Sequence, residues 1–337
     1  MSDDSQIQYL QRLSISHIAT RILMSGVQLG VFETIGGGKK TASEIAHDTS
    51  TSVRGMRILL DCLVSFQLLT KSDQRYSLST ISSQYLWKIS PRYMGHLFED
   101  ERSLEQWNHM NEAIRSGKPL RKKETQDDEA ALFSGLARSL SVVNWQPAQR
   151  VAKLLCIEHA GMKVLDVACG SGVWGIAIAQ ADPQSHITGH DLPAILKITQ
   201  SCVKQQNVED QFDYLPGDLR LVEFGESRFD VVILGNIVHS QGEKTSRELL
   251  HRVYRSLKDS GRVAIIDIVP DEDRTGPQAS LIVALAMLLD SEEGDLFTLS
   301  EYTSWLREAG FHKIDTIDIG SHSPLIIGYK SIPPADL

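Results

Sequence analysis

The stretch VLDVACGSGVWGIAIAQ, residues 164–180, decides the fold of the larger part of the chain. An apolar run ends in the spacing Gly-x-Gly-x-x-Gly, made by Gly170, Gly172 and Gly175, and a helical pattern follows. Strand, glycine turn and helix in this order are typical of the first βα unit of a nucleotide-binding sheet. Further strand patterns alternate with helical patterns of about ten to fifteen residues, which predicts an α/β fold with a Rossmann-like, doubly wound, mostly parallel sheet.

The elements expected around this sheet alternate between strands and helices. The expected strands are residues 163–168, 186–192, 212–218, 229–236 and 262–270. The expected helices are residues 172–182, 193–207 and 246–261, the last of them closed by Gly261. In such sheets the ligand binds beyond the carboxyl ends of the strands, where the glycine turn also lies.

The first hundred residues have a different, mainly helical pattern. Residues 16–35 carry a helical apolar stripe that is expected to end at Gly36, and Thr41 with Glu44 has the spacing of a capping box. A helix with apolar residues at 56, 59, 60 and 63 follows, and then a hairpin over residues 68–79. Helix, turn, helix and hairpin together predict a winged-helix-like domain.

A winged helix raises the alternative of DNA binding, which the charge disfavours. The reading helix would offer Arg54 and Arg57, but Glu44, Asp48 and Asp61 surround them, and the whole chain of 337 residues has a net charge of −9. We therefore expect no nucleic-acid partner. A packing or dimerisation module that forms a C2 homodimer is the preferred interpretation.

Composition excludes other classes of protein. The hydrophobic content is 42%, as in globular proteins, and the apolar run at 280–289 is too short to span a bilayer. No secretory leader pattern opens the chain, so we expect a cytoplasmic protein without a membrane partner. The four cysteines include no Cys-x-x-Cys pair, so neither a zinc site nor a disulfide framework is expected.

Three parts are expected along the chain. Residues 1–100 form the helical winged-helix-like dimerisation domain, and residues 101–155 form a helical connector. Residues 156–337 form the Rossmann-like domain.

The glycine turn by itself allows two ligands. A dinucleotide site is one alternative, because Asp191 lies 19 residues after Gly172, where a ribose-binding acid is expected. Against it, Asp166 in the first strand would repel a pyrophosphate and would suit a cationic amino group. Asp218 ends a third strand, where it can accept a hydrogen bond from an adenine amino group while Leu219 packs on the ring. An acidic rim of Asp166, Asp191 and Asp218 fits S-adenosylmethionine, which is cationic and has no phosphate.

At this point the sequence resembles the class I S-adenosylmethionine-dependent methyltransferases. It is most similar to the small-molecule O-methyltransferases that carry an N-terminal winged-helix-like dimerisation domain, and among them to bacterial members of secondary metabolism. The resemblance covers nearly the whole chain. Its segments are GVQLGVFETI, TASEIAHDTSTSVRGMRILLDCLVSFQLL, the glycine turn through HDLPAIL, LPGDL, FDVVILGNIVHS, LKDSGRVAIIDIVPDEDRTGP and GDLFTLSEYTSWLREAGF.

The resemblance implies that residues 156–337 are the S-adenosylmethionine-binding catalytic domain and that the connector, residues 101–155, contributes to the acceptor pocket. It also implies the roles of the site residues. Asp191 is expected to hold the ribose hydroxyls, Asp218 and Leu219 the adenine, and Gly170 with Gly172 the methionine end. The remaining members of the expected cofactor-binding set are Asp166, Leu192 and Asn236. His239 matches the general base, and a neutral imidazole suits proton transfer from a hydroxyl near neutral pH. Asp267 matches the acidic partner of that base, and no metal ligand set is expected.

Departures from the family pattern leave the chemistry open. Ser240 and Gln241 follow His239 where many plant relatives have Asp-Trp, and Asp267 is one methylene shorter than the usual Glu. A second acidic partner falls at Leu296. O-methylation of a phenol or enol is expected. C- or N-methylation and non-methylating chemistry, as in pericyclase-like or hydroxylating relatives, stay open as alternatives.

The acceptor pocket is the part that the sequence defines least. A small aromatic or polyketide-like secondary metabolite is the expected acceptor, and its identity stays open. Trp145, Met110 and Met287 are candidates for lining its pocket, because large aromatic and adaptable thioether side chains suit such ligands.

Overall fold

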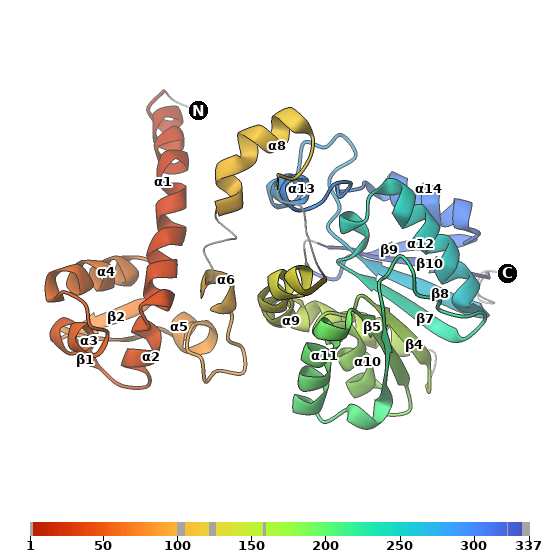
Figure 1. The fold of residues 1–337 in the computed structure, drawn as a ribbon, viewed down its shortest axis with the longest axis horizontal. Coiled ribbons are helices and arrows are strands. Elements are labelled where there is room, and N and C mark those ends of the chain that lie inside the picture. The colour runs from red at the N-terminus through yellow and green to blue at the C-terminus, as the bar shows by residue number, and fades with distance from the viewer. Residues whose placement is uncertain (1–2, 100–104, 121–125, 158–159, 322, 332–337) are drawn as a thin grey trace. The chain divides into compact units, whose positions relative to one another are not determined.

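The computed structural model describes residues 3–99, 105–120, 126–157, 160–321 and 323–331 (Figure 1). The chain divides into two compact units, Met1–Ser103 and Leu104–Leu337. Each unit is described by itself.

The first unit is helical with a small sheet. Its elements are α1 (Asp3–Gln28), α2 (Val31–Ile35), β1 (Lys40–Thr41), α3 (Ala42–Asp48), α4 (Val53–Ser65), β2 (Leu69–Ser72), β3 (Arg75–Leu78), α5 (Thr80–Tyr85) and α6 (His96–Glu99). The sheet has the order β1-β3-β2 and is antiparallel throughout. The expected hairpin is therefore present as β2 and β3, directly after the helix pair α3 and α4.

Local signals explain most element boundaries of the first unit. The capping box is confirmed, since the Glu44 amide donates to Thr41 Oγ1 at 3.2 Å and the Thr41 amide donates to Glu44 Oε2 at 2.6 Å. The expectation of one helix running to Gly36 is wrong. The helix is interrupted between α1 and α2 at Gly30, whose φ of 67° is a left-handed conformation that ends a helix.

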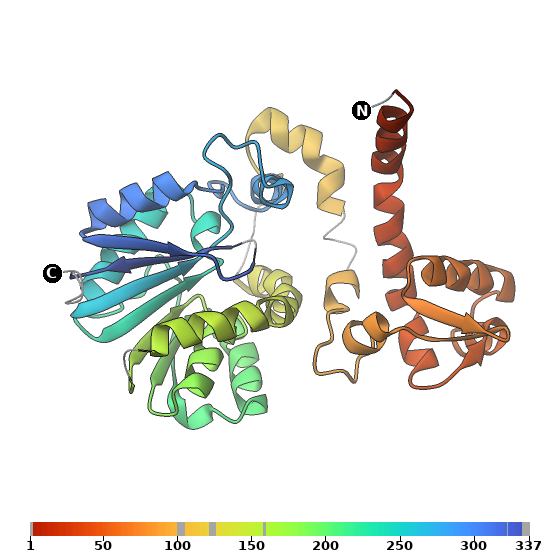
Figure 2. The same cartoon turned by 180° about the vertical axis from the view of Figure 1, so that it is seen from behind.

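The second unit contains the predicted sheet with helices on both faces (Figure 2). Its elements are η1 (Gln106–His109), α8 (Met110–Ser116), α9 (Gln126–Cys156), β4 (Lys163–Val167), α10 (Val173–Ala181), β5 (His186–Asp191), α11 (Pro193–Gln205), η2 (Glu209–Gln211), β6 (Phe212–Pro216), β7 (Phe229–Gly235), η3 (Val238–Ser240), α12 (Glu243–Ser256), β8 (Leu257–Ile266), α13 (Gln278–Asp290), α14 (Leu299–Ala309), β9 (Lys313–Ile317) and β10 (Leu325–Tyr329). The strand order is β6-β5-β4-β7-β8-β10-β9. Strands β4 to β8 are parallel, and β10 is antiparallel to both of its neighbours.

Two hydrophobic clusters lie on the opposite faces of this sheet. Alternation along β4 sends Val164 to the cluster that includes residues of α9, α10 and α11. Leu165 and Val167 belong to the other cluster, together with residues of α12 and α14. Asp166 therefore faces the same side as Val164, toward α10.

One expected helix boundary is wrong. The pattern over residues 246–261 predicts a helix that ends at Gly261, but α12 ends at Ser256 and β8 begins at Leu257. Leu257 is fully buried and lies opposite Phe229 in the sheet, so its burial in the strand outweighs a continued helical turn.

Candidate active site

The glycine turn joins β4 to α10 and is held from both sides by hydrogen bonds. The Cys169 amide donates to the carbonyl of His190 at 2.9 Å, and Thr199 Oγ1 donates to the carbonyl of Gly170 at 2.7 Å. Gly172 begins the helix with a φ of 77°, and a Cβ there would lie 2.9 Å from Thr199 Cγ2. Only glycine fits this position without strain.

Gly175 brings α10 close to the sheet. A Cβ at this residue would lie 2.8 Å from Ile187 Cγ2 and 3.1 Å from Asp166 Oδ2. The third glycine of the spacing therefore serves close packing between helix and strand.

Asp166 is fully buried at this turn with one oxygen bonded and one not. Its Oδ2 accepts a hydrogen bond from the Gly175 amide at 3.0 Å, and within the described parts of the chain Oδ1 has no hydrogen-bond partner. Burial raises the pKa of this carboxyl to about 8, with the charge of Asp191 adding to the rise and the Gly175 amide opposing it. A buried carboxyl oxygen without a hydrogen-bond partner is suited to bind a cationic group of a ligand.

Asp191 ends β5 beside the turn. Its Oδ2 accepts from the Gly170 amide and its Oδ1 from the Leu192 amide, each at 2.8 Å. The carboxylate is thus fixed by main-chain donors at the strand end next to Asp166. Leu192 is partly buried and packs against Ile195 and Ile198 of α11.

Asp218 lies just after β6, the next strand of the sheet, and faces an arginine of its own turn. Arg220 donates to Asp218 Oδ1 from Nε at 3.0 Å and to Oδ2 from Nη2 at 2.7 Å. Hydrogen bonding to Arg220 lowers the pKa of Asp218 against the opposing effect of burial. This carboxylate is expected to face adenine, and its contact with Arg220 is not predicted from the sequence. Leu219 is partly buried against the second cluster.

The acidic rim therefore lies at the carboxyl ends of three neighbouring parallel strands, β4, β5 and β6. Asp166 is fully buried, the side chain of Asp218 is 16% exposed, and Asp191 is partly buried. Asn236 lies on the other side of β4, one residue past β7. Its φ is 56°, and its amide donates to the carbonyl of Ile266 at 2.8 Å.

His239 and Asp267 lie together beyond the ends of β7 and β8. The imidazole Nδ1 pairs with Asp267 Oδ1, and the His239 amide donates to Asp267 Oδ2 at 3.1 Å. Both residues are buried, Asp267 completely. Burial lowers the pKa of the imidazole, but the charge and hydrogen bond of Asp267 raise it more, so the pKa of His239 lies above its usual value. The shorter acidic side chain thus still reaches the histidine.

Tyr302 on α14 also belongs to this cluster and is not predicted from the sequence. Its hydroxyl donates to Asp267 Oδ2 at 3.0 Å, and the residue is fully buried. A tyrosine four residues after the N-cap Thr298 offers no separate signal in the sequence. Leu296, the position of the second acidic partner in the family, is also fully buried.

The candidates for an acceptor pocket are all partly buried but do not form one group. Met110 begins α8 and Met287 lies in α13, and these two helices contact each other (Figures 1 and 2). Trp145 of α9 packs against the hydrophobic cluster on the α10 face of the sheet. Core packing therefore accounts for Trp145 by itself.

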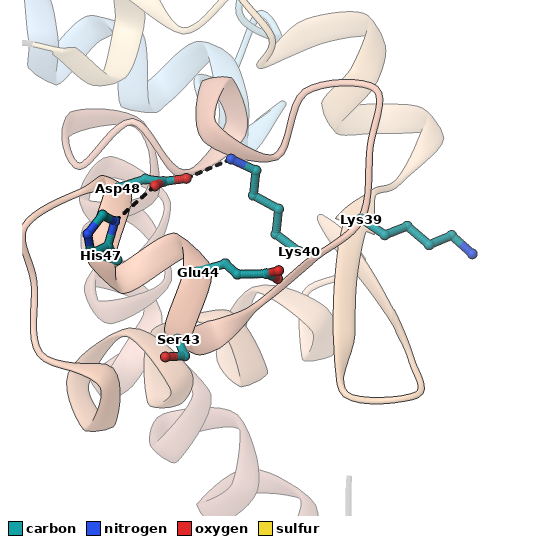
Figure 3. Close-up of a pocket in the computed structure, with 6 residues that line it drawn as sticks. All are labelled: Lys39, Lys40, Ser43, Glu44, His47 and Asp48. Carbon is teal, nitrogen blue, oxygen red and sulfur yellow. Dashed lines mark hydrogen bonds and ion pairs between the residues drawn. The ribbon is translucent and has the colours of Figure 1, made fainter.

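Several basic side chains of the first unit are paired with carboxylates. Arg57 contacts Asp61 at 2.9 Å, and Lys71 contacts the same carboxylate at 2.7 Å. Figure 3 shows a polar hollow beside α3, where Lys40 pairs with Asp48 at 2.7 Å. The hollow is lined by Lys39, Lys40, Ser43, Glu44, His47 and Asp48. Its own charges neutralise one another, and it contains none of the predicted site residues.

Among the residues that the structure describes, no helix has both the length and the apolar character needed to cross a membrane. No group of three or more His, Cys, Asp or Glu side chains in those same ranges is placed to hold a metal ion.

Comparison with known proteins gives two family matches. The O-methyltransferase domain model matches residues 98–312, and the O-methyltransferase dimerisation domain model matches residues 11–88. The chain is 28% identical over 329 residues to the tetracenomycin polyketide synthesis 8-O-methyl transferase TcmO of Streptomyces glaucescens, with 95% of each chain covered. It is 25% identical to the 3-hydroxy-5-methyl-1-naphthoate 3-O-methyltransferase of Streptomyces sahachiroi, covering 90% of this chain and 88% of that one. The crystal structure of human N-acetylserotonin methyltransferase in complex with SAM has the same fold, with a TM-score of 0.85, 24% identity and 98% and 99% coverage.

Proposed function

The chain belongs to the O-methyltransferase family, and from this premise we propose that it methylates a hydroxyl of a small aromatic, polyketide-like acceptor with His239 as general base. The observation that carries the proposal is the buried pair of His239 and Asp267 at the sheet edge that also holds the glycine turn. The enzyme is a methyltransferase. The acceptor and the role of each residue are the proposed part.

S-adenosylmethionine is the cofactor, and when bound it supplies an electrophilic methyl group on a positively charged sulfur. The residues fit its chemistry, because Asp166 Oδ1 is buried with no hydrogen-bond partner among the described residues and would hold the ammonium group. Asp191 would hold the ribose hydroxyls, and Gly170 with Gly172 would allow close approach of the backbone.

The adenine end would be held by residues beyond the next strand. Asp218 would accept a hydrogen bond from the amino group once Arg220 yields part of its contact, and Leu219 would pack on the ring. Leu192 and Asn236 would complete the wall of the site.

His239 is suited to take the proton of the acceptor hydroxyl. Since Asp267 engages Nδ1, the nitrogen left to accept a proton is Nε2. The acceptor oxygen would gain the methyl group as the methyl–sulfur bond of the cofactor breaks and leaves a neutral thioether. The hydroxyl proton would move to Nε2 of His239, and Asp267 would stabilise the imidazolium that results. The same carboxylate fixes the ring orientation, so little reorganisation is needed during the reaction.

The acceptor would lie among side chains that adapt to flat apolar rings. Met110 and Met287, on two helices that contact each other, are the proposed contacts, because thioether groups pack favourably against aromatic rings. The two Streptomyces relatives carry names that refer to aromatic or polyketide products, which supports this class of acceptor.

The first unit is proposed to pair two copies of the chain. It matches a dimerisation domain, and α1 exposes a set of apolar side chains, namely Ile7, Tyr9, Leu10, Leu13, Ile15 and Ile18. An exposed apolar set of this size is typical of an interaction surface. A C2 homodimer would cover it.

Two measurements test the proposed function. Calorimetry with S-adenosylmethionine, S-adenosylhomocysteine and NAD should show binding of the first two and none of NAD. Tight binding of NAD with no binding of S-adenosylhomocysteine would overturn the interpretation of the glycine turn.

The second measurement identifies the atom that is methylated. The enzyme is incubated with 3-hydroxy-5-methyl-1-naphthoate or N-acetylserotonin and a ¹³C-methyl cofactor, and the product is examined by NMR. A methoxy signal is the expected result. A methyl group on carbon or nitrogen would refute the hydroxyl as the acceptor.

A further inference from the structure

The carboxylate of Asp267, which follows β8, contacts residues of two further elements of the second unit, η3 and α14. Its Oδ1 accepts from the Ile268 amide at 2.8 Å and pairs with the imidazole of His239, which lies in η3. Its Oδ2 accepts from the His239 amide at 3.1 Å and from the hydroxyl of Tyr302, on α14, at 3.0 Å. Tyr302 thus contributes a side-chain donor from a separate helix, 35 residues away in the sequence.

The position of Tyr302 is fixed by the start of α14. Thr298 and Glu301 form a capping box, in which the Thr298 amide donates to Glu301 Oε2 at 2.6 Å. Arg274 pairs with the same Glu301 carboxylate at 3.1 Å, and the Ser300 amide donates to Glu272 Oε1 at 3.0 Å. Because the first helical turn is held at several points, the tyrosine ring has little freedom to leave the carboxylate.

The ring itself is held by aromatic neighbours. Tyr302 packs edge-on against Phe297, with ring centroids 6.3 Å apart, and lies 5.8 Å from the ring centroid of Trp305. The hydroxyl is therefore the only polar atom of a side chain that is otherwise in an apolar environment. Such a hydroxyl is costly to bury unless it is bonded, and its bond goes to Asp267.

We propose that Tyr302 is a positioning residue for the His239–Asp267 pair. Its hydroxyl fixes the orientation of the Asp267 carboxylate and draws part of its negative charge away from the imidazole. This inference rests on the proposed function of His239 as general base. It also explains how the pair is oriented although the family's second acidic position is Leu296 in this chain.

The electrostatics give the sign of the effect. Burial, and then the charge of Asp267, raise the pKa of the Tyr302 phenol, so the phenol stays a neutral donor over the working pH range. Without this donor, the carboxylate would present more charge to the imidazole and raise the pKa of His239 further. A higher pKa keeps the base protonated, and therefore inactive, up to a higher pH.

The other charged groups around His239 are already engaged. Asp295 donates its amide to the His239 carbonyl at 2.9 Å, while its carboxylate lies 3.9 Å from Arg274. Glu301, on the element that carries Tyr302, is bonded within its capping box and to Arg274. Asp267 is thus the carboxylate through which a change at Tyr302 reaches His239.

The test compares Tyr302→Phe with Tyr254→Phe. The first removes one oxygen from the cluster, whereas the second removes one from a tyrosine of α12 that packs edge-on against Phe311 at 5.2 Å. Tyr302→Phe should lower kcat about tenfold, with KM for the acceptor and the affinity for S-adenosylhomocysteine changed less than about twofold. The acidic limb of the kcat/KM profile should move up by about half a pH unit. Tyr254→Phe should change neither kcat nor the acidic limb of the kcat/KM profile.

A direct readout does not depend on the acceptor. In protein with ¹⁵N-labelled histidine, the signal lost in His239→Ala identifies His239, and its titration should move to higher pH in Tyr302→Phe. In an Asp267→Asn background the same tyrosine change should leave the titration unmoved, because the coupling runs through the carboxylate.

Two failures can be told apart. If His239→Ala is inactive but Tyr302→Phe leaves both the pH profile and the His239 titration unchanged, Tyr302 only packs, and the inference is overturned. If His239→Ala keeps full activity, the proposed general base is wrong. The titration then still decides whether Tyr302 acts on the pair.

Discussion

The two halves of the candidate site are built in different ways. At the ends of β4 and β5, the carboxylates of Asp166 and Asp191 are held by main-chain amides, those of Gly175, Gly170 and Leu192. Beyond β7 and β8, side chains of η3 and α14 converge on Asp267. The first half depends on backbone geometry that a short motif fixes, whereas the second depends on the identity of side chains that are far apart in sequence.

The largest expected effect lies in the half built from side chains. His239→Ala should lower kcat by roughly 10²–10⁴-fold, because it removes the proposed general base. Calorimetry should find the affinity for S-adenosylhomocysteine nearly unchanged, since the proposed cofactor contacts lie in the other half. His251→Ala, which removes an exposed histidine of α12, is the control and should keep full activity.

If His239→Ala keeps the wild-type kcat, His239 is not the general base. The division of the site into a cofactor-binding half and a catalytic half would then be wrong. A joint loss of rate and cofactor affinity would show instead that the two halves are coupled.

The next effect lies in the half held by the main chain. Asp191→Ala should weaken binding of S-adenosylhomocysteine by about 10- to 100-fold, because hydrogen bonds to a charged acceptor are lost. Isothermal titration measures the change. Asp213→Ala removes an exposed carboxylate of the neighbouring strand β6 and should leave the affinity unaltered. Equal losses in both variants would mean that general charge, and not the ribose contact, determines affinity.

The same contrast explains what could be predicted from the sequence. The sheet and the glycine turn could be predicted, because apolar periodicity and glycine spacing are patterns of a few neighbouring residues. The structure contains both. The placement of Asp191 at the end of its strand follows from the same patterns. Boundaries were less predictable: Gly30 divides one expected helix, and β8 takes the end of another.

The contacts around Asp267 could not be read from the sequence. Nothing local indicates that Tyr302 reaches across to this carboxylate, or that the shorter aspartate still meets His239, since both depend on how α14 and η3 pack. The pairing of Asp218 with Arg220 was missed for a different reason. The two residues are close in sequence, but the pattern carries no information on which way an exposed arginine turns.

The smallest expected effect is the release of a proton from Asp166 when the cofactor binds. Its pKa of about 8 means that the carboxyl carries a proton at neutral pH in the free enzyme. A cationic amino group bound beside Oδ1 favours the charged form, so cofactor binding should release up to about one proton at pH 7 and almost none above about pH 9. Calorimetry with S-adenosylhomocysteine in two buffers of different ionisation enthalpy measures this release. Asp166→Asn should abolish it, while Asp213→Asn should preserve it. If the release persists in Asp166→Asn, the proton comes from another group. The proposed contact of Asp166 Oδ1 with the amino group of the cofactor would then lack support.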